Sequence, residues 1–179
     1  MKTRAAVLWG LGEKWEVEEV ELDPPGPDEV LVRLTATGLC HSDEHLVTGD
    51  LPIPLPVVGG HEGAGTVVEV GAGVENVAEG DSVILTFLPS CGHCSYCARG
   101  MGNMCDLGAA LMMGPQIDGT YRFHARGEDV GQMCLLGTFS EYPTAADARH
   151  PGFEDAAEIV DHTTLYGKLA KSPEERVAV

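Results

Sequence analysis

The chain has 179 residues, of which 28 are acidic and 11 are basic, so its formal net charge is −17. This acidic balance argues against binding to nucleic acid or to anionic membrane surfaces, because both need basic patches. The apolar fraction of 44% argues against disorder, and the length suits one domain, or one domain with part of a second. No membrane span and no signal peptide is predicted, so we expect a cytoplasmic protein.

Several short runs before residue 88 are rich in β-branched and apolar residues, bounded by glycine and proline. They predict a mainly β, barrel-like unit. Three prolines hold residues 51–56 in an extended loop. The expected strands cover residues 5–9, 15–22, 30–37, 65–70 and 82–87, and the first two form a hairpin.

Residues 89–133 are poor in periodicity and rich in Gly, Cys and Met, so we expect a long excursion without a core of its own. Beyond residue 142 the pattern changes. Apolar residues recur at helical spacing over residues 153–171, and Ser172-Pro173-Glu174-Glu175 is typical of a helix start. We therefore expect residues 143–179 to form a short helical tail.

Four cysteines lie close together in the excursion with the spacing C-x2-C-x2-C-x7-C. Four thiolates so spaced favour a tetrahedral zinc site. An iron–sulfur cluster fits the x7 gap less well, and disulfides are rare in the cytosol. A closed four-thiolate site has no open position for a substrate, so we interpret it as structural. The four residues are Cys91, Cys94, Cys97 and Cys105.

A second set of metal-ligating residues is divided between two segments, G-L-C-H-S-D-E-H at 38–45 and G-G-H-E-G-A-G at 59–65. Cys40 and His61 suit an open zinc site, Glu62 lies beside the metal, and Asp43 is placed to orient His61. The alternative is a buried cysteine and a loop histidine without a metal.

The order of these motifs resembles that of the medium-chain zinc-dependent alcohol dehydrogenases. Residues 1–142 resemble the GroES-like catalytic domain of that family, a partly open β-barrel with a zinc-lobe excursion, here at 89–106. The stretches 118–123 and 135–142 are most similar to bacterial alcohol dehydrogenases that hold NAD tightly and are assayed with the dye N,N-dimethyl-4-nitrosoaniline (NDMA).

The resemblance implies two zinc ions. Cys40 and His61 would bind the catalytic zinc, and Glu62 would approach it as an alternative ligand. The structural zinc would be held by Cys91, Cys94, Cys97 and Cys105.

The resemblance also implies a substrate, a small alcohol or aldehyde, whose hydride is exchanged with NAD. Ser42 would take the proton of the hydroxyl, His45 would pass it to solvent, and His41 would reach the pyrophosphate of the cofactor. A serine and a histidine can relay a proton near neutral pH.

Two parts of the family pattern are missing. The third catalytic-zinc ligand has no match, because Cys134, the one remaining cysteine, comes too early in the chain. No strand–G-x-G-x-x-G–helix unit is present, since the glycines of 60–65 and 71–73 flank a predicted strand. We therefore expect no Rossmann domain, with NAD bound only if a second domain or a partner supplies that fold. The barrel face that the cofactor domain normally covers is expected to promote self-association.

Two functions remain open. The first is the zinc-binding catalytic domain of an alcohol or aldehyde oxidoreductase, inactive alone. The second is a non-catalytic, zinc-stabilised structural or interaction domain derived from that fold.

We predict that the isolated chain binds about one zinc ion tightly and does not oxidise alcohols with NAD. One site has four ligands, the other has two that match the family, and two ligands with water bind zinc weakly. Metal analysis of the purified protein checks the first statement. Fluorescence of newly formed NADH, given a simple alcohol, would contradict the second.

Overall fold

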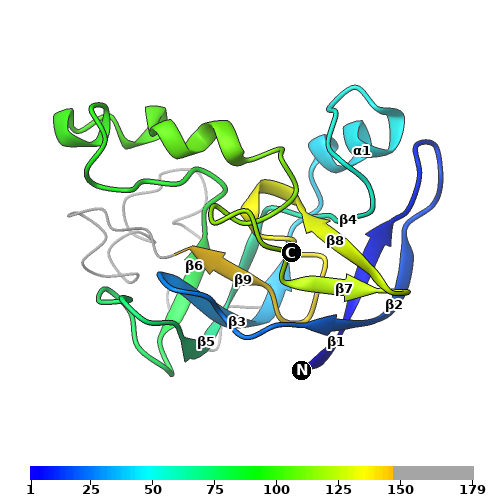
Figure 1. Ribbon diagram of the computed structural model, residues 1–179, viewed down its shortest axis with the longest axis horizontal. Coiled ribbons are helices and arrows are strands. Elements are labelled where there is room, and N and C mark those ends of the chain that lie inside the picture. Colours follow the sequence, from blue (N-terminus) through cyan, green and yellow to red (C-terminus); the bar gives the residue numbers. More distant parts are fainter. Residues whose placement is uncertain (147–179) are drawn as a thin grey trace, which may run out of the picture.

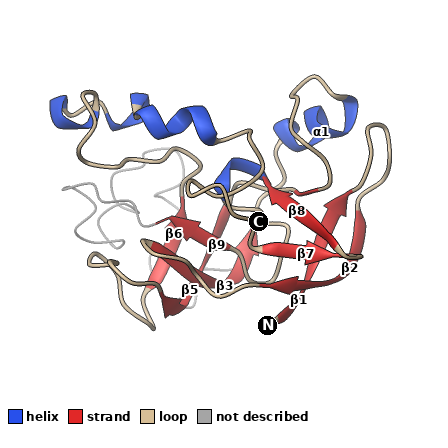
Figure 2. Cartoon of the chain, viewed as in Figure 1, coloured by secondary structure: helices blue, strands red, loops and turns tan. Residues whose placement is uncertain are grey.

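The computed structural model describes residues 1–146, and its strands form two layers, a barrel and a four-stranded sheet, with the cysteine-rich lobe of residues 89–106 on one side (Figure 1; Figure 2). Short 3-10 turns cover Cys97–Arg99, Gly102–Met104, Asp106–Ala110 and Met133–Leu135. In chain order the main elements are β1 (Lys2–Leu8), β2 (Glu16–Leu22), β3 (Glu29–Thr37), α1 (His41–Thr48), β4 (Val57–Val58), β5 (Gly63–Val70), β6 (Ser82–Leu85), β7 (Phe123–Ala125), β8 (Glu128–Gln132) and β9 (Thr144–Ala146). No helix in this part of the chain is long and apolar enough to cross a membrane.

Five strands close a barrel in the order β1-β2-β7-β8-β4. The predicted hairpin of β1 and β2 is confirmed, with an antiparallel register that pairs Lys2 with Glu21 and Val7 with Glu16. Val20 and Leu22 of β2 point inward and are buried, whereas Glu19 and Glu21 face outward. This alternation places the apolar side of the hairpin against Phe123, which is completely buried in the barrel core.

A second sheet has the order β6-β5-β3-β9. Strands β3, β5 and β6 are the three predicted from their β-branched runs. Strand β9 pairs antiparallel with the start of β3, so the sheet extends four residues past residue 142, where we expected the tail to begin. The helix expected over residues 153–171 lies outside the described residues.

The mainly β fold with a barrel is confirmed, but two local expectations are wrong and one helix was missed. The barrel is closed rather than partly open. The excursion of 89–133 is shorter than expected, because its last part supplies β7 and β8. The segment after β3 is a helix, α1. Its eight residues are too few for a helical repeat to be recognised in the sequence.

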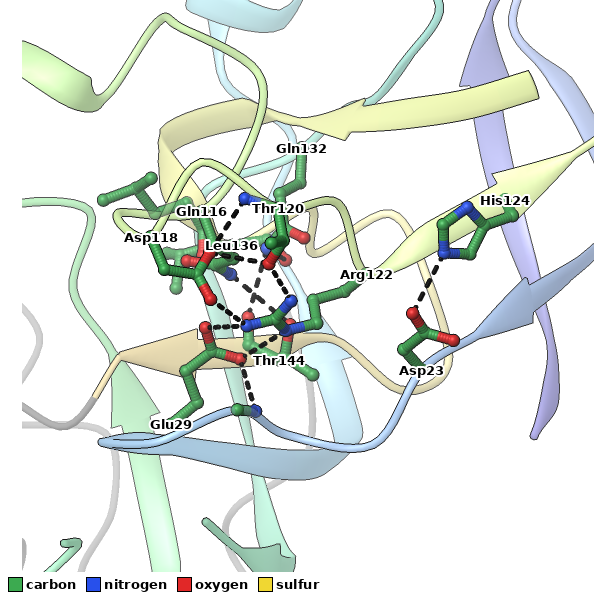
Figure 3. A network of polar contacts seen from close by, with 12 residues as sticks. Asp23, Glu29, Gln116, Asp118, Thr120, Arg122, His124, Gln132, Leu136 and Thr144 are labelled. Carbon is green, nitrogen blue, oxygen red and sulfur yellow. Dashed lines mark hydrogen bonds and ion pairs between the residues drawn. The ribbon is translucent and has the colours of Figure 1, made fainter. Parts of the chain in front are cut away.

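A buried ion pair joins the segment before β7 to the start of β3 (Figure 3). The Arg122 guanidinium donates two hydrogen bonds to Glu29, of 2.8 and 2.9 Å, and one of 2.9 Å to Asp118. Arg122 and Glu29 are almost fully buried. Burial opposes ionisation of Asp118, but hydrogen bonds from Thr120 and Arg122 outweigh it and lower its pKa to about 2. The two layers are therefore linked by charge as well as by apolar packing.

We predict that Arg122→Met destabilises the zinc-loaded protein by about 3–5 kcal/mol, because it leaves the Glu29 carboxylate buried without its cation, with the Gly26 N–H still bonded to it. The double variant Arg122→Met/Glu29→Met removes both charges and should recover most of this loss. Urea unfolding followed by circular dichroism measures both values. Equal stability of the single and double variants would contradict the prediction.

Candidate metal centres

Cys40 is the N-cap residue of the helix α1 and is fixed there by the Asp43 carboxylate. The Cys40 N–H donates a 2.9 Å hydrogen bond to Asp43 Oδ2, and the Gly60 N–H donates one of 3.1 Å to Oδ1. Asp43 is 1% exposed. The helix ends at Gly49, whose φ of 82° is the left-handed conformation that glycine adopts readily. Asp43 thus ties the start of α1 to the loop before β5.

The same carboxylate faces the imidazole of His61. Asp43 Oδ1 lies 3.4 Å from Nδ1, and the contact raises the pKa of His61, while burial opposes this. On its other side Nε2 lies 4.0 Å from Glu62 Oε1, and the ring meets Phe87 edge to face at 5.7 Å. Nδ1 has no hydrogen bond of good geometry. A carboxylate at Nδ1 fixes the ring and leaves Nε2 to a ligand.

Three donor atoms meet at this point. One atom each from Cys40, His61 and Glu62 lies within 4.8 Å of the other two. The Ser42 backbone and hydroxyl, followed by His61, lower the pKa of the Cys40 thiol, which favours the thiolate that binds metal. One thiolate, one imidazole and one carboxylate are the donors that an open zinc site uses, so these residues fit the ion. The three predicted residues are brought together.

The residues expected to handle the proton and the cofactor lie on α1. Cys40 Sγ is 3.6 Å from Ser42 Oγ, and His45 follows one turn later with its ring 4.8 Å from that of His41. His45 Nδ1 is also 3.4 Å from Asp50. Asp50 accepts a 2.7 Å hydrogen bond from Thr48, which, with a smaller contribution from His45, lowers its pKa. Sequence reasoning missed Asp50, because its role depends on a helix that was not predicted.

The four lobe cysteines form a separate cluster. One sulfur from each of Cys91, Cys94, Cys97 and Cys105 lies within 4.8 Å of the other three. A tetrahedral zinc with bonds of ~2.3 Å holds its sulfurs about 3.8 Å apart, so the cluster fits this ion. The structure gives all six cysteines of the chain as free thiols.

Backbone amides already point at these sulfurs. The N–H groups of Cys94 and Cys97 approach the preceding cysteine sulfur at 3.3 and 3.4 Å. Amide donors, that of Cys97 first, lower the pKa of Cys94 to about 6, whereas burial raises that of Cys105 to about 11. The loop is therefore shaped around negative sulfur, and a metal is the group that makes all four thiols ionise. His93 is exposed, with Nδ1 2.8 Å from the Cys91 carbonyl, and is not part of the cluster.

Cys134 lies apart from both clusters. It packs against Leu8, Leu46 and Val57 beneath α1, and burial raises the pKa of its thiol to about 12. Within residues 1–146, no further Cys, His, Asp or Glu joins Cys40, His61 and Glu62. His150 and His162, which follow in the sequence, lie outside the described part.

An open apolar groove of about 580 Å³ begins next to the Cys40 site. Leu39, which is 87% exposed, lines it together with Trp15, Val17 and Phe139. Self-association through it stays a prediction.

Comparison with known proteins identifies the family in which this arrangement of residues occurs. Residues 26–152 match the family model described as the alcohol dehydrogenase GroES-like domain. A putative alcohol dehydrogenase D of Mycobacterium tuberculosis is 56% identical over 146 residues, which are 82% of this chain and 40% of that protein. An NDMA-dependent alcohol dehydrogenase of Amycolatopsis methanolica is 55% identical over 144 residues, 80% of this chain and 39% of that protein.

Solved structures give the same result. An alcohol dehydrogenase zinc-binding domain protein from Burkholderia ambifaria is 40% identical, with a TM-score of 0.77, over 82% of this chain and 40% of that one. Benzyl alcohol dehydrogenase from Acinetobacter calcoaceticus is 29% identical, with a TM-score of 0.72 and the same coverage. The chain thus spans about 40% of the length of the relatives that it matches. It belongs to the zinc-dependent alcohol dehydrogenase family and corresponds to the GroES-like domain of those enzymes.

Proposed function

We propose that this chain provides the alcohol-binding, metal-binding part of an NAD-linked alcohol or aldehyde oxidoreductase. The observation that carries the proposal is the convergence of Cys40, His61 and Glu62 around one point, with Asp43 buried behind His61. Structural zinc sites use four protein ligands, whereas catalytic sites use three and keep one position open. Three donors therefore support a catalytic site.

A zinc ion held there supplies a Lewis acid that polarises the hydroxyl group of an alcohol. The chain's own residues then handle the proton. Ser42 lies beside Cys40 and accepts the proton of the hydroxyl while it gives its own proton to His45, one helical turn away, which then releases a proton to solvent. Asp50 contacts His45 Nδ1 and orients that ring. His41, exposed at the first turn of α1, is placed for an anionic group of the cofactor.

NAD is the proposed hydride acceptor, since no side chain accepts hydride. The described strands pair antiparallel except β4 with β8, and none of them forms the strand–helix–strand unit of a dinucleotide site. We propose that this fold comes from another segment or from a partner. Six free cysteines suit a reducing compartment, which supports a cytoplasmic location.

A second candidate is a zinc-stabilised structural domain without catalysis. The complete four-cysteine cluster supports it, because that site needs nothing outside the described residues. The two candidate functions differ in whether a metal at the Cys40 site binds an added ligand.

We predict that the site built by Cys40 has an open coordination position. Protein loaded with one equivalent of Zn²⁺, which the four-cysteine cluster takes first, is titrated with Co²⁺. Visible cobalt absorption bands should appear, shift when imidazole is added, and shift back as a primary alcohol competes. Cys40→Ser should abolish the bands. Bands that neither imidazole nor the alcohol changes would favour the structural candidate.

We predict that Cys97→Ser removes the tightly bound zinc and opens the lobe, which has no apolar core of its own. Arg99 provides a sharp readout, because it is exposed and is the only Lys or Arg between Arg33 and Arg122. Trypsin should cut after Arg99 at least about tenfold faster in the variant. Cys40→Ser is the matched control and should keep the wild-type rate. Equal cleavage of Cys97→Ser and wild type would contradict a metal-held lobe.

A further inference from the structure

Glu62 has a fixed backbone but an exposed side chain. Its carbonyl accepts two hydrogen bonds, one of 2.8 Å from Thr37 Oγ1 and one of 3.1 Å from the Gly38 N–H. The side chain, in contrast, is 51% exposed, and no hydrogen bond joins its carboxylate to another of the residues that the structure describes. Such a side chain is free to turn toward water unless packing directs it. The position of the carboxylate beside His61 therefore needs a cause.

Gly38 leaves the space that the Glu62 side chain occupies. A Cβ built on Gly38 would collide with Glu62 Oε2 and would lie 3.0 Å from its Cβ and 3.1 Å from its Cδ. The Gly38 backbone does not require glycine, since its φ is not in the left-handed region. The neighbouring side chain is what a larger residue would meet there.

We infer that Gly38 is a positioning residue that keeps Glu62 in place as the third metal donor of the Cys40–His61 site. This inference rests on the metal site proposed above and deepens it. The missing side chain at Gly38 lets the Glu62 carboxylate lie back against the main chain, within 4.8 Å of the Cys40 and His61 donors. Any larger residue at 38 displaces the carboxylate toward solvent. The site then keeps two donors, one thiolate and one imidazole.

The displacement falls on the side chain because the backbones cannot separate easily. The two hydrogen bonds to the Glu62 carbonyl hold its main chain against that of residues 37 and 38. Turning an exposed carboxylate costs little, so Gly38→Ala should fold normally. A competing route would be a shift of Gly38 itself, which would move Cys40, two residues away.

A double-mutant cycle separates the two routes. Zinc-preloaded full-length chain is titrated with Co²⁺, and the dissociation constant is read from the visible bands for wild type, Gly38→Ala, Glu62→Ala and the double variant. We expect Gly38→Ala and Glu62→Ala each to weaken Co²⁺ binding about tenfold. Gly38→Ala should have no further effect in the Glu62→Ala background. Gly108→Ala is the matched control, because a Cβ there meets no atom within 4 Å and its φ is ordinary.

Four results would overturn the inference. Unchanged Co²⁺ binding in Gly38→Ala would show that the position of the Glu62 carboxylate does not depend on the space that Gly38 leaves. A further loss in the double variant would mean that Gly38 acts through Cys40 instead. Absence of any second metal in the wild type would end both this inference and the proposed function, whereas the first two results leave the proposed function intact. If Gly38→Ala fails to fold, the inference requires that the double variant folds, and its failure too would contradict it.

Discussion

The carboxylate of Asp43 is almost completely buried where three parts of the chain meet, and its contacts decide where the reactive groups lie. It accepts hydrogen bonds from the Cys40 and Gly60 amides and faces His61 Nδ1. The N-terminus of α1, the loop before β5 and the imidazole are thereby held in one arrangement. A buried carboxylate is stable when it is hydrogen-bonded in this way. Because Cys40 and His61 come from segments about 20 residues apart, the open metal site depends on this junction.

The two candidate metal centres have different physical roles. In the lobe, amide hydrogen bonds and four sulfurs create a closed set of donors in a loop with few buried side chains. A metal there replaces the missing core. At the Cys40 site the barrel and its sheet already hold the donor residues, so a metal ion bound there, as we propose, would be free to bind an added ligand. The 2.8 and 2.9 Å bonds from Arg122 to Glu29 strengthen the link between these two layers.

The sequence predicted the parts whose pattern is local. The hairpin of β1 and β2 follows from alternation of valine and glutamate, and the lobe follows from cysteine spacing. Strands β7 and β8 were missed because each is short. They pair with each other, but their outer partners, β2 and β4, lie far away in the chain. The role of Gly38 was equally invisible, since it depends on a side chain 24 positions later. Tertiary contact, rather than propensity, determines these features.

The central claim is that one chain builds two unlike metal sites, a closed site of four thiolates and an open site organised by Asp43. Cadmium-113 NMR of the chain loaded with two equivalents of Cd²⁺ tests it directly, because the resonance moves downfield with each thiolate ligand. The account predicts two signals. One lies far downfield and does not move when imidazole is added, and the other lies upfield and shifts when imidazole is added. Asp43→Asn should remove or broaden only the upfield signal. A single downfield signal, or two signals that both survive Asp43→Asn unchanged, would contradict the account.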